Sequence, residues 1–400
     1  MTMWDSDGIG PESPKLVVGG DFQLAGGTEA QNIALFDPAS NTWHPFGSGI
    51  TGSVRSLIST SNGNLVAGGD FDTAGEQQVN NIARWNGTAW VTLGTGMNGS
   101  VLALAALPNG DIAAGGSFFV SDGTLSNYVA RWDGIGWSAL GTGTNDYVFS
   151  LAALPNGDLV AGGFFGTAGG TFVRNIARWN GVAWSDIGSG VSGVVHSLAV
   201  FPNGDIVAGG SFSQAGNVPA NRIARWNGSQ WRPLGTGMSN GFVHVLTVLP
   251  NNDLVAGGYF QSAGGVVVNN IARWNGAEWS ALRGGTSADV WALAALPDGD
   301  LIAAGFFAIV DYTFSHRIAR WGVPDDCLSC DSIDFNDDTS LFDPQDIEAF
   351  LSVYSEGPCV PSGATCGDID FNNDTSVFDP CDINSFLVVY SEGPCTPCGV

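Results

Sequence analysis

Lysine is nearly absent from this sequence, and acidic residues far outnumber basic ones. Lysine occurs once, at Lys15, and 13 Lys and Arg residues stand against 38 Asp and Glu, for a net charge of −25. Such a chain lacks the cationic surface that neutralises phosphates, so we expect no nucleic-acid partner. Basic partners, divalent cations or a high-salt environment fit this charge better.

The sequence also lacks long apolar runs, and most of the chain lacks cysteine. No run approaches the length of a membrane helix, so we expect no membrane span. Residues 1–326 contain no cysteine, whereas seven cysteines fall in residues 327–400. A small cysteine-rich segment is typical of a disulfide-held domain outside the cytoplasm. The pairs Cys327-x-x-Cys330 and Cys395-x-x-Cys398 leave a four-cysteine zinc site as the alternative.

The cysteines therefore predict an extracellular or cell-surface location. The start of the chain, MTMWDSDGIG, does not show the basic and then apolar pattern of a signal peptide. We expect the given start to lie inside a longer secreted precursor.

A glycine-rich apolar stretch recurs along residues 1–321. LVAGGFF at 159–165 returns with small changes at 16, 65, 112, 206 and 254. Two aromatic positions keep a step of 47 to 49 residues: Phe22, Phe71, Phe118, Phe165, Phe212, Phe260 and Phe307, and Phe36, Trp85, Trp132, Trp179, Trp226, Trp274 and Trp321. Repeats of about 40 to 50 residues indicate a solenoid, a propeller or another array.

Each repeat reads as four short strands. Within 148–190 these are VFSLAAL, LVAGGFF, NIARW and AWSDIG, separated by the turns PNGD and NG and by a glycine-rich loop. The strands lack clean polar and apolar alternation, which indicates burial on both faces. Four antiparallel strands repeated radially predict an all-β, seven-bladed propeller over residues 1–322. The glycine pairs would let neighbouring backbones approach near its axis.

The unit resembles the kelch repeat in its apolar run, glycine pair and spaced aromatic pair. The first unit, with ALFDPASNTWHPFGSG, carries the kelch-like ending most fully. The seventh unit stops at Trp321 without the W-x-x-L-G strand of the others. Since a closed propeller commonly completes its last blade from the other terminus, we expect that strand upstream of Met1.

Residues that return in nearly every unit are expected to be structural. We predict that the repeated arginines pair with acidic groups and that the repeated tryptophans pack between blades. The arginines are Arg84, Arg131, Arg178, Arg225, Arg273 and Arg320, and the repeated turn aspartates are Asp111, Asp158, Asp205, Asp253 and Asp300. No HxH, HExxH or Ser/His/Asp grouping is visible, although His196 and His244 hold near-equivalent positions. We therefore name no catalytic residue.

Irregular positions are the better guide to a ligand. The third unit has the loop VSDGTLSNY and the seventh has AIVDYTFSH, where most units have a TAGG-like loop. Binding specificity on repeat folds sits in such loops. The predicted ligand-binding residues are Tyr128, Trp291, Tyr312, Phe314 and His316.

Residues 323–400 contain two copies of an acidic pattern. CDSIDFNDDTSLFDPQDIEAFLSVYSEGPC and CGDIDFNNDTSVFDPCDINSFLVVYSEGPC each carry D-x-N-x-D before a helix-like segment. Alternating oxygen ligands of this kind suit a hard cation. The tandem arrangement resembles a dockerin, particularly the cysteine-flanked kind of planctomycete-type secreted proteins, and predicts a small α domain with two calcium loops.

The resemblance implies two calcium sites and a docking role. The ligands carried over are Asp334, Asn336, Asp338, Ser340 and Asp346, and Asp370, Asn372, Asp374, Ser376 and Asp382, with the two serines using backbone carbonyls. Both loops close at position 13 and have Thr at position 6, unlike dockerins, so Asp343 and Asp379 are alternative closing ligands. Cysteines bracket each copy, and we predict disulfides Cys330–Cys359, Cys366–Cys395 and Cys327–Cys398, which leaves Cys381 unpaired.

Together these features predict a secreted or cell-surface binding protein. The propeller would recognise a polysaccharide or a protein, and the tail would dock in a calcium-dependent way onto a cohesin-like or surface partner. The alternative is an extracellular polysaccharide-degrading enzyme, a hydrolase or lyase, with the same anchor.

Overall fold

The structure, a computed structural model, describes residues 1–6, 13–310, 313–315 and 317–322. The chain divides into two units, Met1–Gly322 and Val323–Val400. All regular elements in the described residues are β-strands. Within them, no helix is long and apolar enough to cross a membrane. The predicted calcium ligands and disulfides lie outside the described residues.

Each repeat forms one antiparallel sheet whose main strands follow chain order, four in the first six repeats and three, among the described residues, in the last. The first strands are β1 (Thr2–Trp4), β7 (Ile50–Ser59), β12 (Val101–Ala106), β18 (Val148–Ala153), β24 (Val195–Val200), β31 (Phe242–Val248) and β37 (Val290–Ala295). The second strands are β2 (Lys15–Gly19), β8 (Leu65–Ala74), β13 (Ile112–Gly116), β19 (Leu159–Gly163), β25 (Ile206–Gly210), β32 (Leu254–Tyr259) and β38 (Leu301–Gly305). These bounds match the predicted segments VFSLAAL and LVAGGFF.

The outer half of each sheet comes from the aromatic end of the repeat. The third strands are β5 (Ile33–Asp37), β10 (Ile82–Trp85), β16 (Val129–Trp132), β22 (Ile176–Trp179), β28 (Ile223–Trp226), β35 (Ile271–Trp274) and β41 (Ile318–Trp321). The fourth strands are β6 (Thr42–Pro45), β11 (Trp90–Thr92), β17 (Trp137–Ala139), β23 (Trp184–Asp186), β29 (Trp231–Pro233) and β36 (Trp279–Ala281). Among the described residues, the last sheet has the order β37-β38-β41 and no fourth strand.

Short hairpins between the second and third strands replace the loops that the sequence predicted. They pair β3 (Leu24–Ala25) with β4 (Thr28–Glu29), β14 (Val120–Ser121) with β15 (Thr124–Leu125), β20 (Thr167–Ala168) with β21 (Thr171–Phe172), β26 (Gln214–Ala215) with β27 (Val218–Pro219), β33 (Ser262–Ala263) with β34 (Val266–Val267), and β39 (Ile309–Val310) with β40 (Thr313–Phe314). In the second sheet β9 (Gln77–Gln78) pairs directly with β8, and β30 (Met238–Ser239) pairs with β33.

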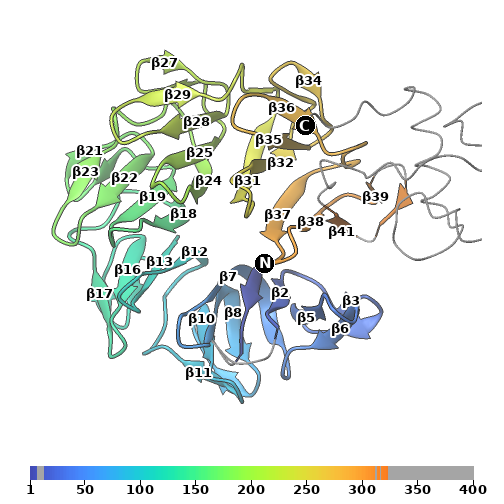
Figure 1. Ribbon diagram of the computed structural model, residues 1–400. Helices are drawn as coiled ribbons and strands as arrows, with labels where there is room; N and C mark the ends of the chain where they lie inside the picture. The colour runs from blue at the N-terminus through green and yellow to red at the C-terminus, as the bar shows by residue number, and fades with distance from the viewer. Residues whose placement is uncertain (7–12, 311–312, 316, 323–400) are drawn as a thin grey trace, which may run out of the picture. The chain divides into compact units, whose positions relative to one another are not determined.

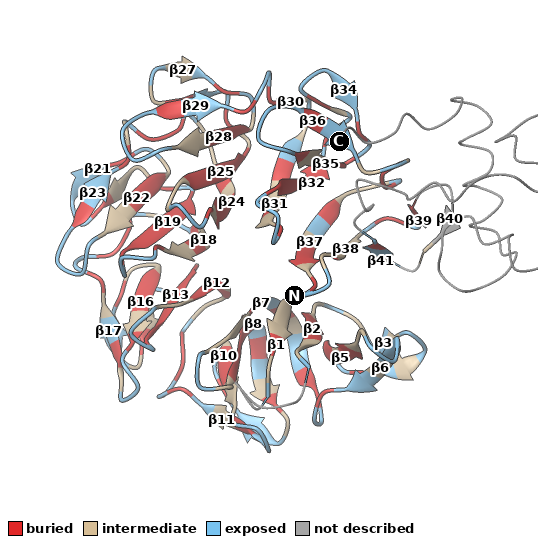
Figure 2. Cartoon of the chain, viewed as in Figure 1, coloured by how far each residue is buried: buried red, intermediate tan, exposed pale blue. Residues whose placement is uncertain are grey.

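The sheets stand radially around a common centre, with the first strands innermost (Figure 1). Each apolar cluster joins one sheet to the next, and burial is greatest on the two inner strands (Figure 2). The ring closes where Leu16 and Phe36 of the first sheet pack with Leu296 and Ile302 of the last. This is the all-β propeller arrangement that the repeats predicted.

The glycine pair has two separate functions. A Cβ on the first glycine would meet a valine of the next sheet; on Gly162 it would lie 2.5 Å from Val195 Cγ1. A Cβ on the second, Gly163, would lie 2.1 Å from the carbonyl oxygen of Tyr147 in its own sheet. The expectation that neighbouring backbones meet at the pair is therefore too simple, because the first glycine faces side chains of the next blade.

The repeated arginines form the expected ion pairs. Five of them bond the turn aspartate of their own sheet, as Arg225 Nε does with Asp205 Oδ2 at 2.7 Å; the pairs are Arg131–Asp111, Arg178–Asp158, Arg225–Asp205, Arg273–Asp253 and Arg320–Asp300. The second unit differs, since Asn64 holds the aspartate position. There Arg84 Nε is buried and has no hydrogen-bond partner within the described part of the chain.

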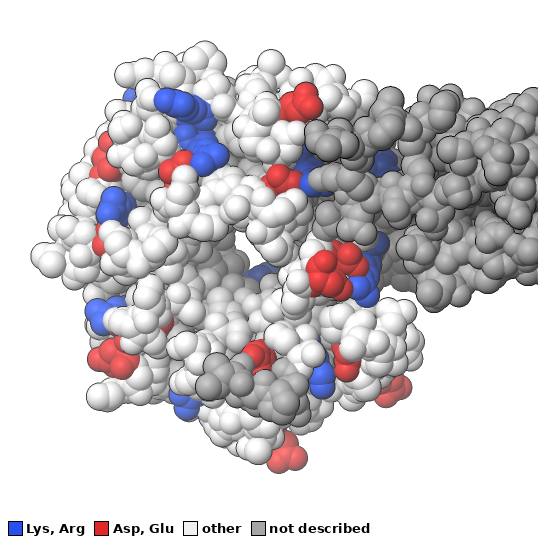
Figure 3. All heavy atoms as spheres, in the orientation of Figure 1, with Lys and Arg blue, Asp and Glu red and all other residues white. Residues whose placement is uncertain are grey.

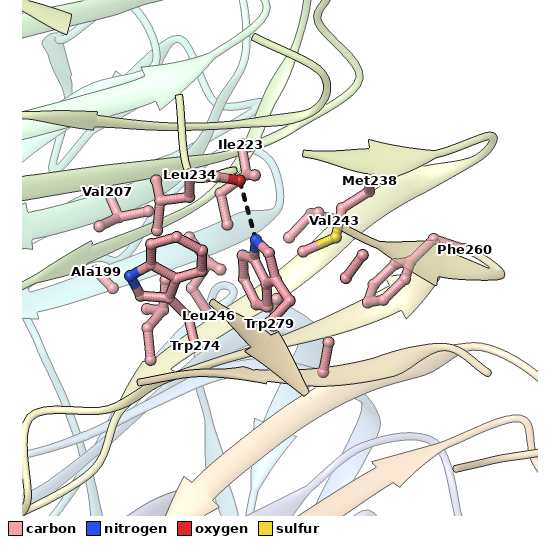
Figure 4. Packing of buried hydrophobic residues seen from close by; sticks show 14 of the residues in the cluster. Ala199, Val207, Ile223, Leu234, Met238, Val243, Leu246, Phe260, Trp274 and Trp279 are labelled. Atoms are coloured by element: carbon pink, nitrogen blue, oxygen red, sulfur yellow. Dashed lines mark hydrogen bonds between the residues drawn. The ribbon is translucent and has the colours of Figure 1, made fainter. Parts of the chain in front are cut away.

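The repeated tryptophans are structural as predicted. In four sheets the fourth-strand indole donates to a backbone carbonyl of the preceding sheet, as Trp279 Nε1 does to Leu234 O at 2.9 Å (Figure 4). The same ring packs against the third-strand tryptophan, with Trp274 and Trp279 centroids 5.4 Å apart. These contacts join neighbouring blades at their outer edges.

Replacing the second glycine tests the tight contact in the inner half of a blade. Gly163→Ala should lower the free energy of unfolding by about 2 to 3 kcal/mol, because the Tyr147 carbonyl must move. Gly166→Ala is the matched control, since nothing lies within 4 Å of its added Cβ, and it should change stability by less than about 0.5 kcal/mol. Equal midpoints of denaturant unfolding for both variants would contradict this account.

Giving Arg84 its missing acceptor should stabilise the second sheet. Asn64→Asp should raise the free energy of unfolding by about 1 kcal/mol, because the new carboxylate can accept from the buried Nε. In an Arg84→Leu background the gain should vanish, as a double-mutant cycle followed by denaturant unfolding would show. A gain of the same size in both backgrounds would exclude the ion pair as its cause.

Candidate functional site

A β-bulge interrupts the first strand of six sheets at the same place. Pairing with the second strand shifts register between Val148 and Ser150, and at the equivalent step in the other five sheets. Bulges leave one residue out of the ladder and redirect its side chain. The bulged residues are Arg55, Leu102, Phe149, His196, His244 and Trp291.

The bulge position varies while its surroundings stay constant. A valine precedes it in every one of the six sheets, and the tight second glycine lies opposite. The bulged residue itself is charged, aliphatic, aromatic or imidazole. A repeat that fixes the backbone and varies one side chain presents several different chemical groups at one level of the ring.

Aromatic rings gather around these positions in five consecutive sheets. We call this set the aromatic arc; it consists of Phe119, Tyr128, Tyr147, Phe149, His196, Phe242, His244, Trp291 and Phe306. Successive ring centroids lie 4.0 to 6.3 Å apart along the set. Most neighbours meet edge to face or tilted, and His244 stacks on Trp291 with 11° between the planes.

Several rings of the arc are open to solvent, unlike the repeated tryptophans. Trp291 is 49% exposed and Phe306 is 64% exposed, whereas Trp279 is 4% exposed. Phe119, Tyr147 and Phe242 are also exposed. Contiguous apolar surface of this kind costs hydration free energy and marks ligand or partner sites in folded proteins.

Tyr128 has an unusual backbone at one end of the arc. Its φ is +69°, in a position where four other repeats have asparagine. Asparagine tolerates this region and there bonds a neighbouring loop, as Asn175 Nδ2 does with Val191 O at 3.0 Å. Tyrosine gives up that bond and is strained, and its ring contacts Phe119 and Tyr147. Such strain is concentrated at functional sites.

Both imidazoles of the arc are neutral at neutral pH. Burial, and then the nearby His244, lower the pKa of His196 from 6.5 to about 4. Burial also lowers the pKa of His244, against the opposing effect of Asp289, whose Oδ2 lies 3.9 Å from Nε2. Each neutral ring offers one donor and one acceptor. Burial and the charge of Asp146 raise the pKa of Tyr128, so its phenol remains a donor.

The bulge positions outside the arc have a different character. Arg55 on β7 pairs with Asp70, Nε to Oδ2 at 3.4 Å, and Asp70 also accepts from Ser100.

Figure 3 shows one face of the ring, mostly uncharged, with a hollow at its centre. No group of three or more His, Cys, Asp or Glu that could hold a metal occurs in the described ranges. The chemistry that the arc offers is stacking and neutral hydrogen bonding.

Two of the five predicted ligand residues, Tyr128 and Trp291, belong to the aromatic arc, toward opposite ends of its series of ring contacts. Phe314 lies on β40 and pairs with Ile309 of β39, so it belongs to a hairpin and not to a first strand that carries a bulge. Tyr312 and His316 lie outside the described residues. Sequence reasoning missed Tyr147, Phe149, Phe242, Phe306 and Phe119. The available signal was a repeat position whose residue changes from unit to unit while the residues around it stay constant.

Comparison with known proteins supports the fold. Residues 9–158 match the family described as the Rax2 C-terminal beta propeller domain, and residues 202–228 match a beta-propeller domain of unknown function, DUF5122. No curated protein matches the chain. The solved WD40 beta propeller domain of Doa1 is 16% identical, with a TM-score of 0.50, over 80% of this chain and 90% of that one. The computationally designed Ika8 protein is 18% identical, with a TM-score of 0.44, over 69% and 74%. The two family matches and the likeness to the Doa1 domain show a β-propeller fold.

Proposed function

We propose that this protein is a non-catalytic binding protein and that the aromatic arc holds its ligand. One observation carries the proposal: aromatic rings at and beside the variable bulge position form a contiguous set across five consecutive sheets, and five of these rings are exposed. A ring needed only for packing would be buried and repeated, as Trp279 is. We take the three-stranded sheet as the seventh blade of the ring.

The ligand that suits this arc best is an extended polysaccharide. Sugar rings present apolar C–H faces that lie flat on exposed aromatic rings, and hydroxyls between those faces. Trp291 and Phe242 supply such platforms, while the neutral His196 and the Tyr128 phenol supply donors and acceptors. The rings themselves are uncharged, which favours an uncharged polysaccharide.

A protein ligand is the second candidate. Exposed Tyr, Trp and Phe are the usual anchors of protein interfaces, and a contiguous apolar patch marks such surfaces. Asp289 and Asp146 beside the arc, together with Arg317 over the Phe306 ring at 5.9 Å, would form a polar rim. The fold also agrees with this role.

The tail proposal rests on the sequence. We propose that residues 323–400 form a dockerin-like module with two calcium loops that docks the protein onto a cohesin-like or surface partner. Its supports are the paired D-x-N-x-D motifs, the bracketing cysteines and the absence of any basic residue after Arg320. Secretion follows from the same cysteines.

Removing the most exposed indole of the arc tests the binding role. Trp291→Ala should weaken polysaccharide binding by about thirtyfold, roughly 2 kcal/mol, with the fold intact because the ring is half exposed. Phe172→Ala is the matched control, since that ring is 65% exposed but lies on an outer hairpin. The full chain is incubated with neutral plant and algal polysaccharides, and retention and new reducing ends are scored together.

The outcomes of the retention and reducing-end assay distinguish the candidate functions. Retention that Trp291→Ala abolishes and Phe172→Ala preserves supports the arc. Equal retention by both variants would contradict it. New reducing ends would replace the binding role with the hydrolase or lyase alternative. Retention only on a protein bait would select the second candidate.

Calcium should bind the tail with a stoichiometry of two per chain. Equilibrium dialysis of the full chain should give two calcium ions, and Asp334→Ala or Asp370→Ala should each leave one, because each removes the first carboxylate of one loop. The double variant should bind none and should still bind polysaccharide. Unchanged stoichiometry in the single variants would contradict the ligand assignment.

A further inference from the structure

The inner strands carry a second variable position besides the bulge. It is a pair of residues at the end of the first and second strands that lies away from the turn joining them. One member precedes the bulged residue by two positions, and the other directly follows the second glycine. We call these two residues the end pair of a sheet. The six end pairs are Ser53–Asp70, Ser100–Ser117, Tyr147–Phe164, Val194–Ser211, Phe242–Tyr259 and Asp289–Phe306.

The members of an end pair lie opposite each other in the backbone. In the fourth sheet Phe164 N donates to Tyr147 O at 2.9 Å, and in the fifth Ser211 N donates to Val194 O at the same distance. Residues that lie directly opposite each other in an antiparallel ladder project from the same face of the sheet. The two side chains of an end pair therefore act as one unit of surface.

The two members of an end pair also vary together. In the fourth and sixth sheets both are aromatic and 42 to 54% exposed: Tyr147 with Phe164, and Phe242 with Tyr259. The first strand of the fifth sheet, β24, packs between β18 and β31 of these two sheets (Figure 1). Its own end pair has small side chains that are partly buried. Two exposed aromatic pairs thus flank one small pair.

His196 belongs to the fifth sheet and connects the two aromatic pairs. Its ring centroid lies 5.8 Å from Phe149 and 6.3 Å from Phe242. Phe149 in turn contacts Tyr147, with centroids 6.2 Å apart. The neutral imidazole offers one hydrogen-bond donor and one acceptor. The fifth sheet therefore places a neutral polar ring between aromatic platforms on either side.

This order of groups fits a chain of linked sugar rings. One sugar can stack on the aromatic pair of the fourth sheet and another on the pair of the sixth. The unit between them spans the fifth sheet, where Val194 and Ser211 are small enough for the chain to approach and His196 can bond its hydroxyls. A protein interface gathers its anchors in a central cluster and does not require this alternation.

We propose that the fifth sheet is the central subsite for a neutral oligosaccharide chain, with the neighbouring units stacked on the fourth and sixth sheets. Phe164 and Tyr259, which lie outside the aromatic arc, are stacking residues of this subsite. His196 selects the central unit through its hydroxyls. The inference rests on the function proposed for the aromatic arc and adds the position and order of the sugar units.

Filling the small position tests the subsite. Ser211→Phe should weaken oligosaccharide binding about tenfold, because its ring would lie in the path of the chain. Phe164 and Phe306 hold the equivalent position in two other sheets, so the fold should accept this change. Ser117→Phe, the same change in the third sheet, is the matched control and should bind as the unchanged protein does. The probes are neutral oligosaccharides, from disaccharide to hexasaccharide, cut from a polysaccharide that the full chain retains, and calorimetry measures their affinity.

Chain length and the flanking rings give an independent test. Affinity should rise about tenfold from disaccharide to tetrasaccharide, because only the longer chain reaches both aromatic pairs. Phe164→Ala and Tyr259→Ala should each remove most of this gain, and their denaturant midpoints should stay close to that of the unchanged protein because both rings are half exposed. Should Ser211→Phe fail to fold, these measurements still decide.

The failure of this inference can be told apart from the failure of the proposed function. Undiminished binding by Ser211→Phe, an equal loss in Ser117→Phe, or a disaccharide that binds as tightly as the tetrasaccharide would overturn the subsite. If Trp291→Ala still abolishes retention in that case, the binding function of the arc stands. A chain that retains no neutral polysaccharide, or retains only a protein bait, would overturn the polysaccharide ligand and this subsite together.

Discussion

The propeller depends on a glycine that has no room for a Cβ atom. At Gly163 and its equivalents, the first-strand carbonyl lies where a side chain would begin, at 2.0 to 2.2 Å from an added Cβ in six sheets. That close contact accommodates the bulge, and the bulge presents the next side chain outside the ladder. The residue after the bulge is used structurally in turn: Ser150 Oγ accepts from Leu198 N of the following sheet at 3.0 Å. The bulge thus lies beside a hydrogen bond between blades, and four rings of the aromatic arc come from its variable position.

Repetition and variation separate structure from function in this chain. Each blade packs against its neighbours in the same way. The same structural features therefore recur: the ion pairs, the interblade indoles and the second glycine. The first glycine is less strictly repeated, since Ala304 stands in its place in the seventh unit. The rings of the arc do not recur from blade to blade, so the shared packing between blades does not account for them.

Much of the fold could be predicted from the sequence because its signals are local. The four strands, the NG turns, the Arg–Asp pairs and the packed tryptophans all follow from patterns within one repeat. The arc could not, because it depends on register. Read as an ordinary strand, VFSLAA gives no reason to separate Phe149 from its neighbours, and only the shift between Val148 and Ser150 does so. Tyr128 was chosen for its irregular loop, whereas its strain is visible only in the backbone angle.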